Sequence, residues 1–144
     1  MIRLSKNFTL DEMLASQTAK RKNIMNVPDA QQMCNLAALV HNILQPLRDW
    51  WGKEVKIGSG FRSKDLNKAV GGVPNSQHLA GQAADLCIDG DLKKGRQWII
   101  WIMENCDFDQ LIFEHNTKGS YWVHVSFRTD GKNRRHCITY LEKK

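Results

Sequence analysis

The sequence predicts an α+β fold in which helices pack around a mainly antiparallel sheet. Three observations support this class: helical segments come first, strand-like segments mixed with helices follow, and the chain closes with strands near enough to pair as hairpins. The chain has 144 residues, a usual size for one domain, and no linker rich in Gly, Ser or Pro divides it. We therefore expect residues 1–144 to form a single domain.

Two helices are predicted in the first third of the chain. The segment Thr9–Glu12 reads as a capping box that opens a short helix. The pair Pro28-Asp29 opens a second helix, and Pro46 within it predicts a kink or an early end, followed by a final turn through Trp50 to Gly52. Apolar residues recur along this helix at helical spacing: Met33, Leu36, Ala37, Val40, Ile43, Leu44 and Leu47.

The rest of the chain alternates between strands and helices. Short alternating or apolar runs predict strands at Val55–Ser59, Ala83–Ile88, Gln110–Glu114, Tyr121–Phe127 and Cys137–Leu141. Helices are predicted at Ser63–Val70 and Leu92–Cys106, and a turn-rich loop covers residues 71–76.

Asp85 interrupts an otherwise apolar strand. A buried carboxylate costs several kcal/mol unless a partner neutralises it. His78 precedes Asp85 by a short connection, and His124 lies between two valines on another predicted strand. Two imidazoles and one carboxylate leave a fourth coordination position open, as a catalytic zinc requires. Each residue also has another interpretation when it is considered alone: His78 could be a surface-loop histidine, Asp85 could pair with an arginine, and His124 could be a core histidine with its hydrogen bonds satisfied.

Several motifs together resemble the zinc D-Ala-D-Ala carboxypeptidase family, peptidase M15. They are Ser59-Gly60-Phe61-Arg62-Ser63, Leu66-Asn67, Val70-Gly71-Gly72, Ser76-Gln77-His78, Gly81, Ala83-Ala84-Asp85-Leu86 and Trp122-Val123-His124-Val125-Ser126. The resemblance spans residues 55–127, and Phe8-Thr9-Leu10 with Glu12 is similar to small phage and prophage members. Vancomycin-resistance dipeptidases and the hedgehog signalling domain share this fold, so the resemblance implies the fold more directly than the activity.

The resemblance implies roles for individual residues. His78, Asp85 and His124 match the family's zinc ligands, one Zn²⁺ per chain. Arg62 matches the arginine that binds a substrate carboxylate, which a planar guanidinium can hold with two hydrogen bonds. A surface ion pair or a loop brace is the other interpretation of Arg62. Ser76, Gln77 and Trp122 are expected to contact the substrate.

The catalytic base is where the chain departs from the family pattern. Many members have an acidic residue three positions before the last ligand and a histidine two before it, but Tyr121 and Trp122 stand there. In a hedgehog-type arrangement a strand-ending glutamate faces the metal, and Glu114 is similar in position if residues 115–120 form a hairpin loop. We therefore predict Glu114 as general base; the alternative is a solvated hairpin carboxylate. His115 and Tyr121 could orient substrate or belong simply to the loop.

The resemblance implies a zinc metallopeptidase that hydrolyses peptide bonds of peptidoglycan stem peptides, as a carboxypeptidase or as an endopeptidase of the endolysin type. The bond could be the D-Ala-D-Ala terminus, the L-Ala-D-Glu bond or a cross-bridge. The alternative is a non-catalytic, metal-stabilised module that binds wall peptide or a protein. With no signal-peptide pattern at the N-terminus, we expect synthesis in the cytoplasm and action on the wall after release, or as part of a phage particle.

Charge and composition set further expectations. The net charge of +6 favours association with polyanions, the cell wall included, without choosing among them. Basic residues near the C-terminus read as a solvated tail without a nucleic-acid motif, so we expect no specific nucleic acid partner: Arg128, Lys132, Arg134, Arg135, Lys143 and Lys144. The longest apolar run, Trp98–Met103, is too short to span a membrane, and we expect a monomer. Four dispersed cysteines without a C-x-x-C pair are expected to be reduced, buried thiols.

Overall fold

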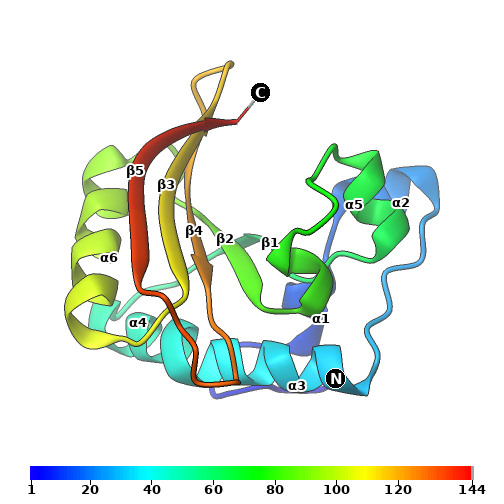
Figure 1. The fold of residues 1–144 in the computed structure, drawn as a ribbon, viewed down its shortest axis with the longest axis horizontal. Coiled ribbons are helices and arrows are strands. Elements are labelled where there is room, and N and C mark those ends of the chain that lie inside the picture. The colour runs from blue at the N-terminus through cyan, green and yellow to red at the C-terminus, as the bar shows by residue number, and fades with distance from the viewer. Residues whose placement is uncertain (144) are drawn as a thin grey trace.

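A five-stranded sheet with strand order β1-β2-β4-β3-β5 forms the centre of the molecule (Figure 1). The computed structural model describes residues 1–143, with the backbone alone for residues 140–143. The strands are β1 (Ile57–Ser59), β2 (Ala83–Cys87), β3 (Gln110–Asn116), β4 (Tyr121–Ser126) and β5 (His136–Lys143). All neighbouring pairs are antiparallel except β3 with β5. The predicted α+β class with a mainly antiparallel sheet is confirmed.

The helices precede the sheet or connect its strands. They are α1 (Leu10–Leu14), α2 (Gln17–Lys22), α3 (Ala30–Leu39), the π-helix η1 (Val40–Leu44), α4 (Gln45–Trp51), α5 (Lys64–Ala69), the 3-10 helix η2 (Gln77–Ala80) and α6 (Leu92–Asn105). The capping box of Thr9 and Glu12 is present at α1. Helix α2 was not predicted. Over residues 1–143, none of these helices combines the length and apolar character that a membrane crossing requires.

The long helical run from α3 to α4 changes its hydrogen-bond pattern near Pro46. Asp29 caps the run, and the α-helix gives way at Val40 to a π-helical turn in which the Gln45 N–H donates to the Val40 carbonyl. Proline has no N–H, so the α-helical ladder cannot continue unchanged through Pro46, and π-turns are a known response. The predicted interruption is therefore present, and Gly52, with φ of +76°, ends the run as expected.

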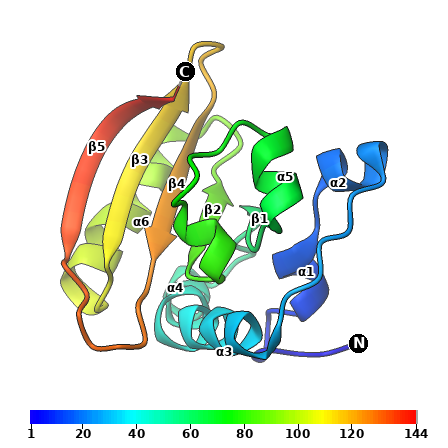
Figure 2. The same cartoon turned by 45° about the vertical axis from the view of Figure 1, so that its right-hand side comes forward.

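The two faces of the sheet differ in chemistry. One face packs against α3, η1, α4 and α6 in the hydrophobic core, which contains apolar side chains of the three central strands: Ala84, Leu86, Leu111, Phe113, Val123 and Val125. Because strand residues alternate between faces, the intervening residues point the other way. That opposite face carries Asp85, Glu114 and His124. Figure 2 shows α1, α2 and α5 grouped beside β1, away from α6.

The second half of the sheet differs from its prediction in two details. β3 continues to Asn116, so the connection to β4 covers residues 117–120 and Glu114 lies inside the strand rather than at its end. The last strand is longer than expected, and it adds to the sheet in parallel beside β3. A parallel neighbour needs a connection longer than a hairpin turn, and β3 is joined to β5 by residues 117–135, which include β4.

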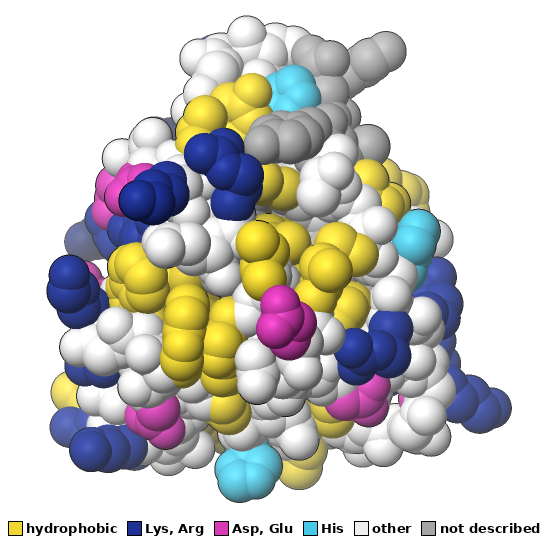
Figure 3. Space-filling model, turned by 90° about the vertical axis from the view of Figure 1, so that its left-hand side faces the viewer, with side chains coloured by type: hydrophobic (Ala, Val, Ile, Leu, Met, Phe, Trp, Pro, Cys, Tyr) yellow, Lys and Arg dark blue, Asp and Glu magenta, His cyan; other side chains and the backbone are white. Residues whose placement is uncertain are grey.

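The outer side of the α4–α6 layer is partly apolar. Figure 3 shows hydrophobic side chains gathered on this side of the molecule, with Lys and Arg side chains around them. Ile100 and Met103 of α6 are exposed, and the exposed Trp50 ring stacks on Trp101 with 5.3 Å between centroids. Trp50 thus covers part of a neighbouring indole that would otherwise face water.

The cysteines are all free thiols, as expected, but only Cys106 is fully buried. Burial raises the pKa of the Cys106 thiol to about 11, so it stays protonated at neutral pH. Cys34 is exposed, and Cys87 and Cys137 are half-buried. The expectation of four buried thiols was therefore wrong for three of them.

Candidate metal centre

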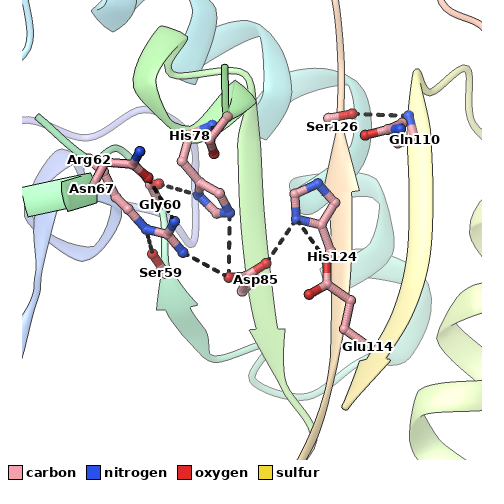
Figure 4. A network of polar contacts seen from close by, with 11 residues as sticks. Ser59, Gly60, Arg62, Asn67, His78, Asp85, Gln110, Glu114, His124 and Ser126 are labelled. Carbon is pink, nitrogen blue, oxygen red and sulfur yellow. Dashed lines mark hydrogen bonds and ion pairs between the residues drawn. The ribbon is translucent and has the colours of Figure 1, made fainter. Parts of the chain in front are cut away.

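Three potential metal ligands converge on the polar face of the sheet. His78 comes from η2, Asp85 from β2 and His124 from β4, where it lies directly opposite Asp85 in the strand register. One ligand atom from each residue lies within 4.8 Å of the other two. Figure 4 shows both imidazoles turned toward the Asp85 carboxylate. The structure thus brings together the three residues that the sequence singled out.

The distances between these atoms fit a single metal ion. His78 Nε2 lies 3.4 Å from Asp85 Oδ2, and His124 Nδ1 lies 3.0 Å from Asp85 Oδ1. A tetrahedral zinc with bonds of about 2.0–2.2 Å separates its ligand atoms by roughly 3.3–3.6 Å. Two imidazole nitrogens and a carboxylate oxygen are also a common zinc donor set. The donor set is therefore one that zinc commonly binds, and each imidazole lies close to that distance from one oxygen of Asp85.

The tautomer of His78 is set by a backbone carbonyl. Its Nδ1 lies 2.7 Å from the Gly60 oxygen, and because a carbonyl can only accept, Nδ1 carries the proton. In the neutral ring, Nε2 is then the nitrogen whose lone pair can bind a metal, and it faces Asp85. A hydrogen bond of this kind from the distal ring nitrogen is typical of metal-bound histidines.

Side chains of α3 support the turn that carries His78. Gln32 Nε2 donates to the Leu79 carbonyl at 3.0 Å, and Asn35 Nδ2 donates to the Ala80 carbonyl at 2.8 Å. At the start of the turn, the Ser76 hydroxyl accepts from the His78 N–H at 3.2 Å. The position of His78 is thus determined by contacts from distant parts of the sequence.

The Asp85 carboxylate is stabilised in its ionised form. Burial raises its pKa, but His78 and His124 outweigh that effect and hold the pKa well below its usual range. Arg62 Nη2 also approaches Asp85 Oδ2 at 3.5 Å. The apparent cost of a carboxylate in this strand is therefore offset by two imidazoles and a guanidinium, so the alternative of an arginine partner is also partly correct.

Arg62 is held on three sides. Its Nε donates to Ser59 Oγ at 3.1 Å, its Nη1 to Asn67 Oδ1 at 3.2 Å, and its Nη2 contacts Asp85. A guanidinium has five N–H donors, so one N–H on each terminal nitrogen has no acceptor within the described part of the chain. Gly72 permits this arrangement, because a Cβ there would lie 2.1 Å from Asn67 Oδ1. Arg62 therefore braces the loop and still presents a two-pronged donor.

Glu114 lies on the same face as the three ligands. Its side chain is 3 % exposed, and Oε1 is 3.7 Å from His124 Nδ1. It pairs in register with Trp122 of β4. The alternative interpretation as a solvated hairpin carboxylate is wrong, because β3 extends past Glu114 and buries it beside the metal ligands.

A cleft of about 870 Å³ opens over this cluster. The ligands, Glu114 and the four residues expected to contact substrate all line it: Arg62, Ser76, Gln77, His78, Asp85, Glu114, Trp122 and His124. His115 and Tyr121 are not among its lining residues; their rings stack on each other with centroids 5.0 Å apart. Their interpretation as loop residues is wrong, because His115 lies in β3 and Tyr121 in β4, where the two pair in register.

Gln77 is tied to a buried ion pair that the sequence did not reveal. Its Nε2 donates to Asp109 Oδ2 at 2.9 Å, while its buried Oε1 has no hydrogen-bond partner among the described residues. Arg134 makes two side-chain bonds to Asp109, at 3.0 and 2.8 Å, which lower the pKa of Asp109 to about 2 although burial opposes them. The hydrogen bond from Gln77 Nε2 to Asp109 therefore fixes the position of the Gln77 amide, which lines the cleft.

The basic residues near the C-terminus are not simply a solvated tail. Arg128 pairs with Asp130 at 2.6 Å, and both Arg128 and Arg134 line the cleft. The clue in the sequence was Asp109, an acid directly before an apolar strand. Lys144 and the side chain of Lys143 lie outside what the structure describes.

Trp122 occupies the position where many relatives have a histidine. It lines the cleft beside His124, and its Nε1–H is buried without an acceptor among residues 1–143. A buried donor without a partner is uncommon in folded proteins. The Nε1–H of the core residue Trp98 is likewise buried without an acceptor among the described residues.

Comparisons with known proteins agree with the geometry. A sequence profile described as Peptidase M15 matches residues 6–126. The zinc D-Ala-D-Ala carboxypeptidase of Streptomyces albus G is 48% identical over 44 residues, which are 30% of this chain and 17% of that protein. The chain thus spans only about a sixth of the length of this relative.

Proposed function

The chain belongs to the peptidase M15 family, and on this basis we propose that it is a zinc peptidase acting on the stem peptides of bacterial peptidoglycan. The observation that carries the proposal is the convergence of His78, Asp85 and His124 in one cleft with a buried carboxylate, Glu114, 3.7 Å from a ligand nitrogen. The peptide substrate is suggested by the Streptomyces relative, which is a zinc D-Ala-D-Ala carboxypeptidase.

In this proposal His78, Asp85 and His124 hold the zinc. Bound zinc supplies Lewis acidity that polarises the peptide carbonyl and makes water nucleophilic near neutral pH. Glu114 accepts a proton from the attacking water and returns it to the nitrogen of the leaving amine. Its burial beside His124 keeps the carboxylate within reach of both positions and away from bulk solvent.

The other cleft residues position the substrate. The two unused N–H groups of Arg62 bind a carboxylate of the peptide. The Trp122 indole N–H donates to a substrate carbonyl, and Gln77 Oε1 accepts from a peptide N–H. Ser76 contributes mainly by capping the turn that holds His78.

Mass spectrometry of stem peptides provides the test. A synthetic pentapeptide and purified peptidoglycan fragments are incubated with zinc-loaded protein, with protein in chelator, and with protein after zinc is restored. We expect hydrolysis that disappears in chelator and returns with zinc. The masses of the products distinguish a carboxypeptidase from an endopeptidase. Intact peptides in the presence of stoichiometric zinc would contradict the proposal.

That negative outcome would favour a non-catalytic binding module. The observation behind this second candidate is the presence of Tyr121 and Trp122 where many relatives have an acid and a histidine. The buried position of Glu114 weighs against it, because a binding module has no need of a carboxylate beside the ligands. Zinc-dependent binding of stem peptide without hydrolysis is its expected result.

We also propose a setting as a wall-lysing protein of phage or prophage type that acts as a monomer without a specific nucleic acid partner. The resemblance to small phage members supports this setting. Loss of turbidity when the protein is added to bacterial cell walls, and the mass measured by light scattering, test its two parts.

A further inference from the structure

A second cleft adjoins the metal cleft. It encloses about 650 Å³ and is lined by residues of α2, β1, α5 and their neighbours. Figure 2 shows these three elements grouped on one side of the molecule. The two clefts share Arg62 and Val70 among their lining residues, so they meet along the Arg62 side chain.

The second cleft is positively charged. Lys20, Lys56 and Arg62 line it, and none of its described lining residues is Asp or Glu. Burial raises the pKa of the Cys87 thiol in this cleft while the charge of Lys56 opposes the rise, which indicates that the Lys56 amine lies near Cys87.

The cations of the two clefts differ in their partners. In the metal cleft Arg128 pairs with Asp130, and Arg134 pairs with Asp109. Neither Lys20 nor Lys56 makes an ion pair within the part of the chain that the structure describes. Two lysines without an ion-pair partner among the described residues thus line the second cleft beside Arg62, where their charge favours an anionic ligand.

Arg62 forms the boundary between the clefts. Its Nε donates to Ser59, a lining residue of the second cleft, whereas its Nη2 faces Asp85 in the metal cleft. A carboxypeptidase needs the substrate space to end where the terminal carboxylate is anchored. Here the open space continues beyond the anchor into a second basic cleft.

We propose that the second cleft binds carboxylate groups of the leaving segment of the substrate, the part released with the new amino group, through Lys20 and Lys56. The inference rests on the proposed function and narrows it to an endopeptidase that prefers an anionic leaving segment. Hydrolysis adds the water hydroxyl to the carbonyl carbon and a proton to the leaving nitrogen, so no further reactant is needed.

The test uses a matched pair of ligands and a matched pair of variants. The ligands are the tetrapeptide L-Ala-γ-D-Glu-L-Lys-D-Ala with free carboxyl groups and the same peptide with its carboxyl groups amidated. Binding to each is measured by calorimetry on zinc-loaded protein carrying Glu114→Gln, which prevents turnover. To this background we add Lys20→Gln with Lys56→Gln, or Lys22→Gln with Lys64→Gln as a control of equal charge outside the cleft.

We expect the free-carboxyl peptide to bind roughly five- to tenfold more weakly when Lys20 and Lys56 are replaced, as two partly exposed ion pairs would allow. The amidated peptide should bind equally to all three proteins, and the control pair should bind as the parent does. Equal binding of the free-carboxyl peptide with and without Lys20 and Lys56 would overturn the inference.

Turnover by the otherwise unchanged protein separates this inference from the proposed function. If no peptide is hydrolysed but replacement of Lys20 and Lys56 still weakens binding of the free-carboxyl peptide, the second cleft stands as an anion site and the peptidase proposal fails. If peptides are hydrolysed and the replacement has no effect, the peptidase proposal stands and the second cleft fails.

Discussion

Asp85 and Glu114 are both carboxylates on the polar face of the sheet, but their neighbours differ. Asp85 contacts two imidazoles and the Arg62 guanidinium, which favour its ionised form and its use as a ligand. Glu114 lies one strand beyond His124, with its Oε1 3.7 Å from His124 Nδ1, and it is not part of the cluster of potential ligand atoms. The proposed mechanism therefore gives the two carboxylates different roles, Asp85 as ligand and Glu114 as general base.

Replacement of Glu114 by Gln should separate metal binding from catalysis. Because Gln keeps the shape but cannot accept the proton, we expect kcat to fall by about 10²- to 10⁴-fold while zinc content and KM change little. Steady-state kinetics with metal analysis measure this, and Glu104→Gln on the exposed side of α6 is the control. Activity of the Gln variant close to that of the parent would remove Glu114 from the mechanism.

Replacement of either histidine ligand should abolish zinc binding. His78→Ala and His124→Ala each leave only two protein ligands, so we expect zinc to fall from about one per chain to a small fraction after dialysis. Elemental analysis provides the measurement, with the exposed His41→Ala as control. Stoichiometric zinc in both ligand variants would refute the ligand assignment.

At the scale of elements, the site depends on close contacts between segments distant in sequence. The Gly60 carbonyl orients His78, and a Cβ at Gly60 would lie 2.4 Å from the Met13 carbonyl oxygen. Phe61 N–H donates to that same Met13 oxygen at 2.8 Å. The turn after β1 is therefore pressed between α1 and the ligand turn η2.

Gly60→Ala should damage both stability and zinc affinity. The backbone must shift to accept the methyl group, and we expect a loss of about 2–4 kcal/mol in the free energy of unfolding with weaker zinc binding. Gly119→Ala is the comparison: its Cβ meets nothing within 4 Å, and only its φ of +84° opposes substitution. That variant should lose about 1 kcal/mol and keep its zinc affinity. Denaturant unfolding and zinc competition titrations measure both, and equal effects in the two variants would refute the role of Gly60.

The ion pair of Asp109 with Arg134 should make stability depend on acid pH. Hydrogen bonds from Arg134 hold the folded-state pKa of Asp109 at about 2, below an unfolded value of about 3.9. A carboxyl group whose pKa is lower in the folded state than in the unfolded state adds to the free energy of unfolding at pH values above its unfolded pKa. This contribution is lost as the pH falls through the folded-state pKa. Arg134→Gln should therefore lower the free energy of unfolding at pH 6, and the difference should shrink between pH 4 and pH 2.

Urea unfolding at several pH values tests this. The protein is kept free of zinc, because release of zinc at acid pH would otherwise also change the free energy of unfolding. Arg96→Gln is the control, since the exposed Arg96 side chain of α6 makes no ion pair with the described residues. A difference for Arg134→Gln that stays constant from pH 6 to pH 2 would contradict the assignment.

At the scale of the whole molecule, one face of the sheet builds the core and the other builds the site. The candidate ligands come from η2, β2 and β4, so a bound metal would tie η2 to two strands that already pair and share the core. The core nevertheless contains α3, α4, α6 and three strands, so it does not depend on the metal for its burial. That residues 1–144 form one domain stays a prediction, and a single cooperative unfolding transition would support it.

Zinc removal should lower the melting temperature without unfolding the protein. A ligand that binds only the folded state stabilises it in proportion to the logarithm of its concentration over Kd, and we expect a decrease of roughly 5–10 °C in chelator. Calorimetry with a parallel circular dichroism spectrum measures the shift and the retained fold. The His78→Ala variant should melt at the same temperature with and without chelator. If chelator lowers the melting temperature of this variant as much as that of the parent, the fall is not caused by loss of zinc from the His78–Asp85–His124 cluster.

The features predicted correctly from the sequence depend on neighbours in the chain. The Thr9–Glu12 capping box, the ends of the helical run at Asp29 and Gly52, and the alternation of β4 around His124 follow from local hydrogen bonding and side-chain periodicity. The ligand triad could be named for a related reason: a carboxylate in an apolar strand needs partners, and the motifs around it resemble those of a known family.

Other features needed the tertiary structure, because they depend on contacts between distant segments. Three of them arise from residues that meet only when the sheet forms. They are the parallel position of β5, the burial of Glu114 inside a longer β3, and the ion pair of Arg134 with Asp109. The second basic cleft likewise combines Lys20 with Lys56 and Arg62. The sequence by itself determined most of the secondary elements, α2 excepted, and named the three candidate metal ligands, since these follow from local periodicity, residue chemistry and the family resemblance. Only the tertiary structure decided which other charges surround the ligands, because electrostatic interactions depend on distance in space rather than along the chain.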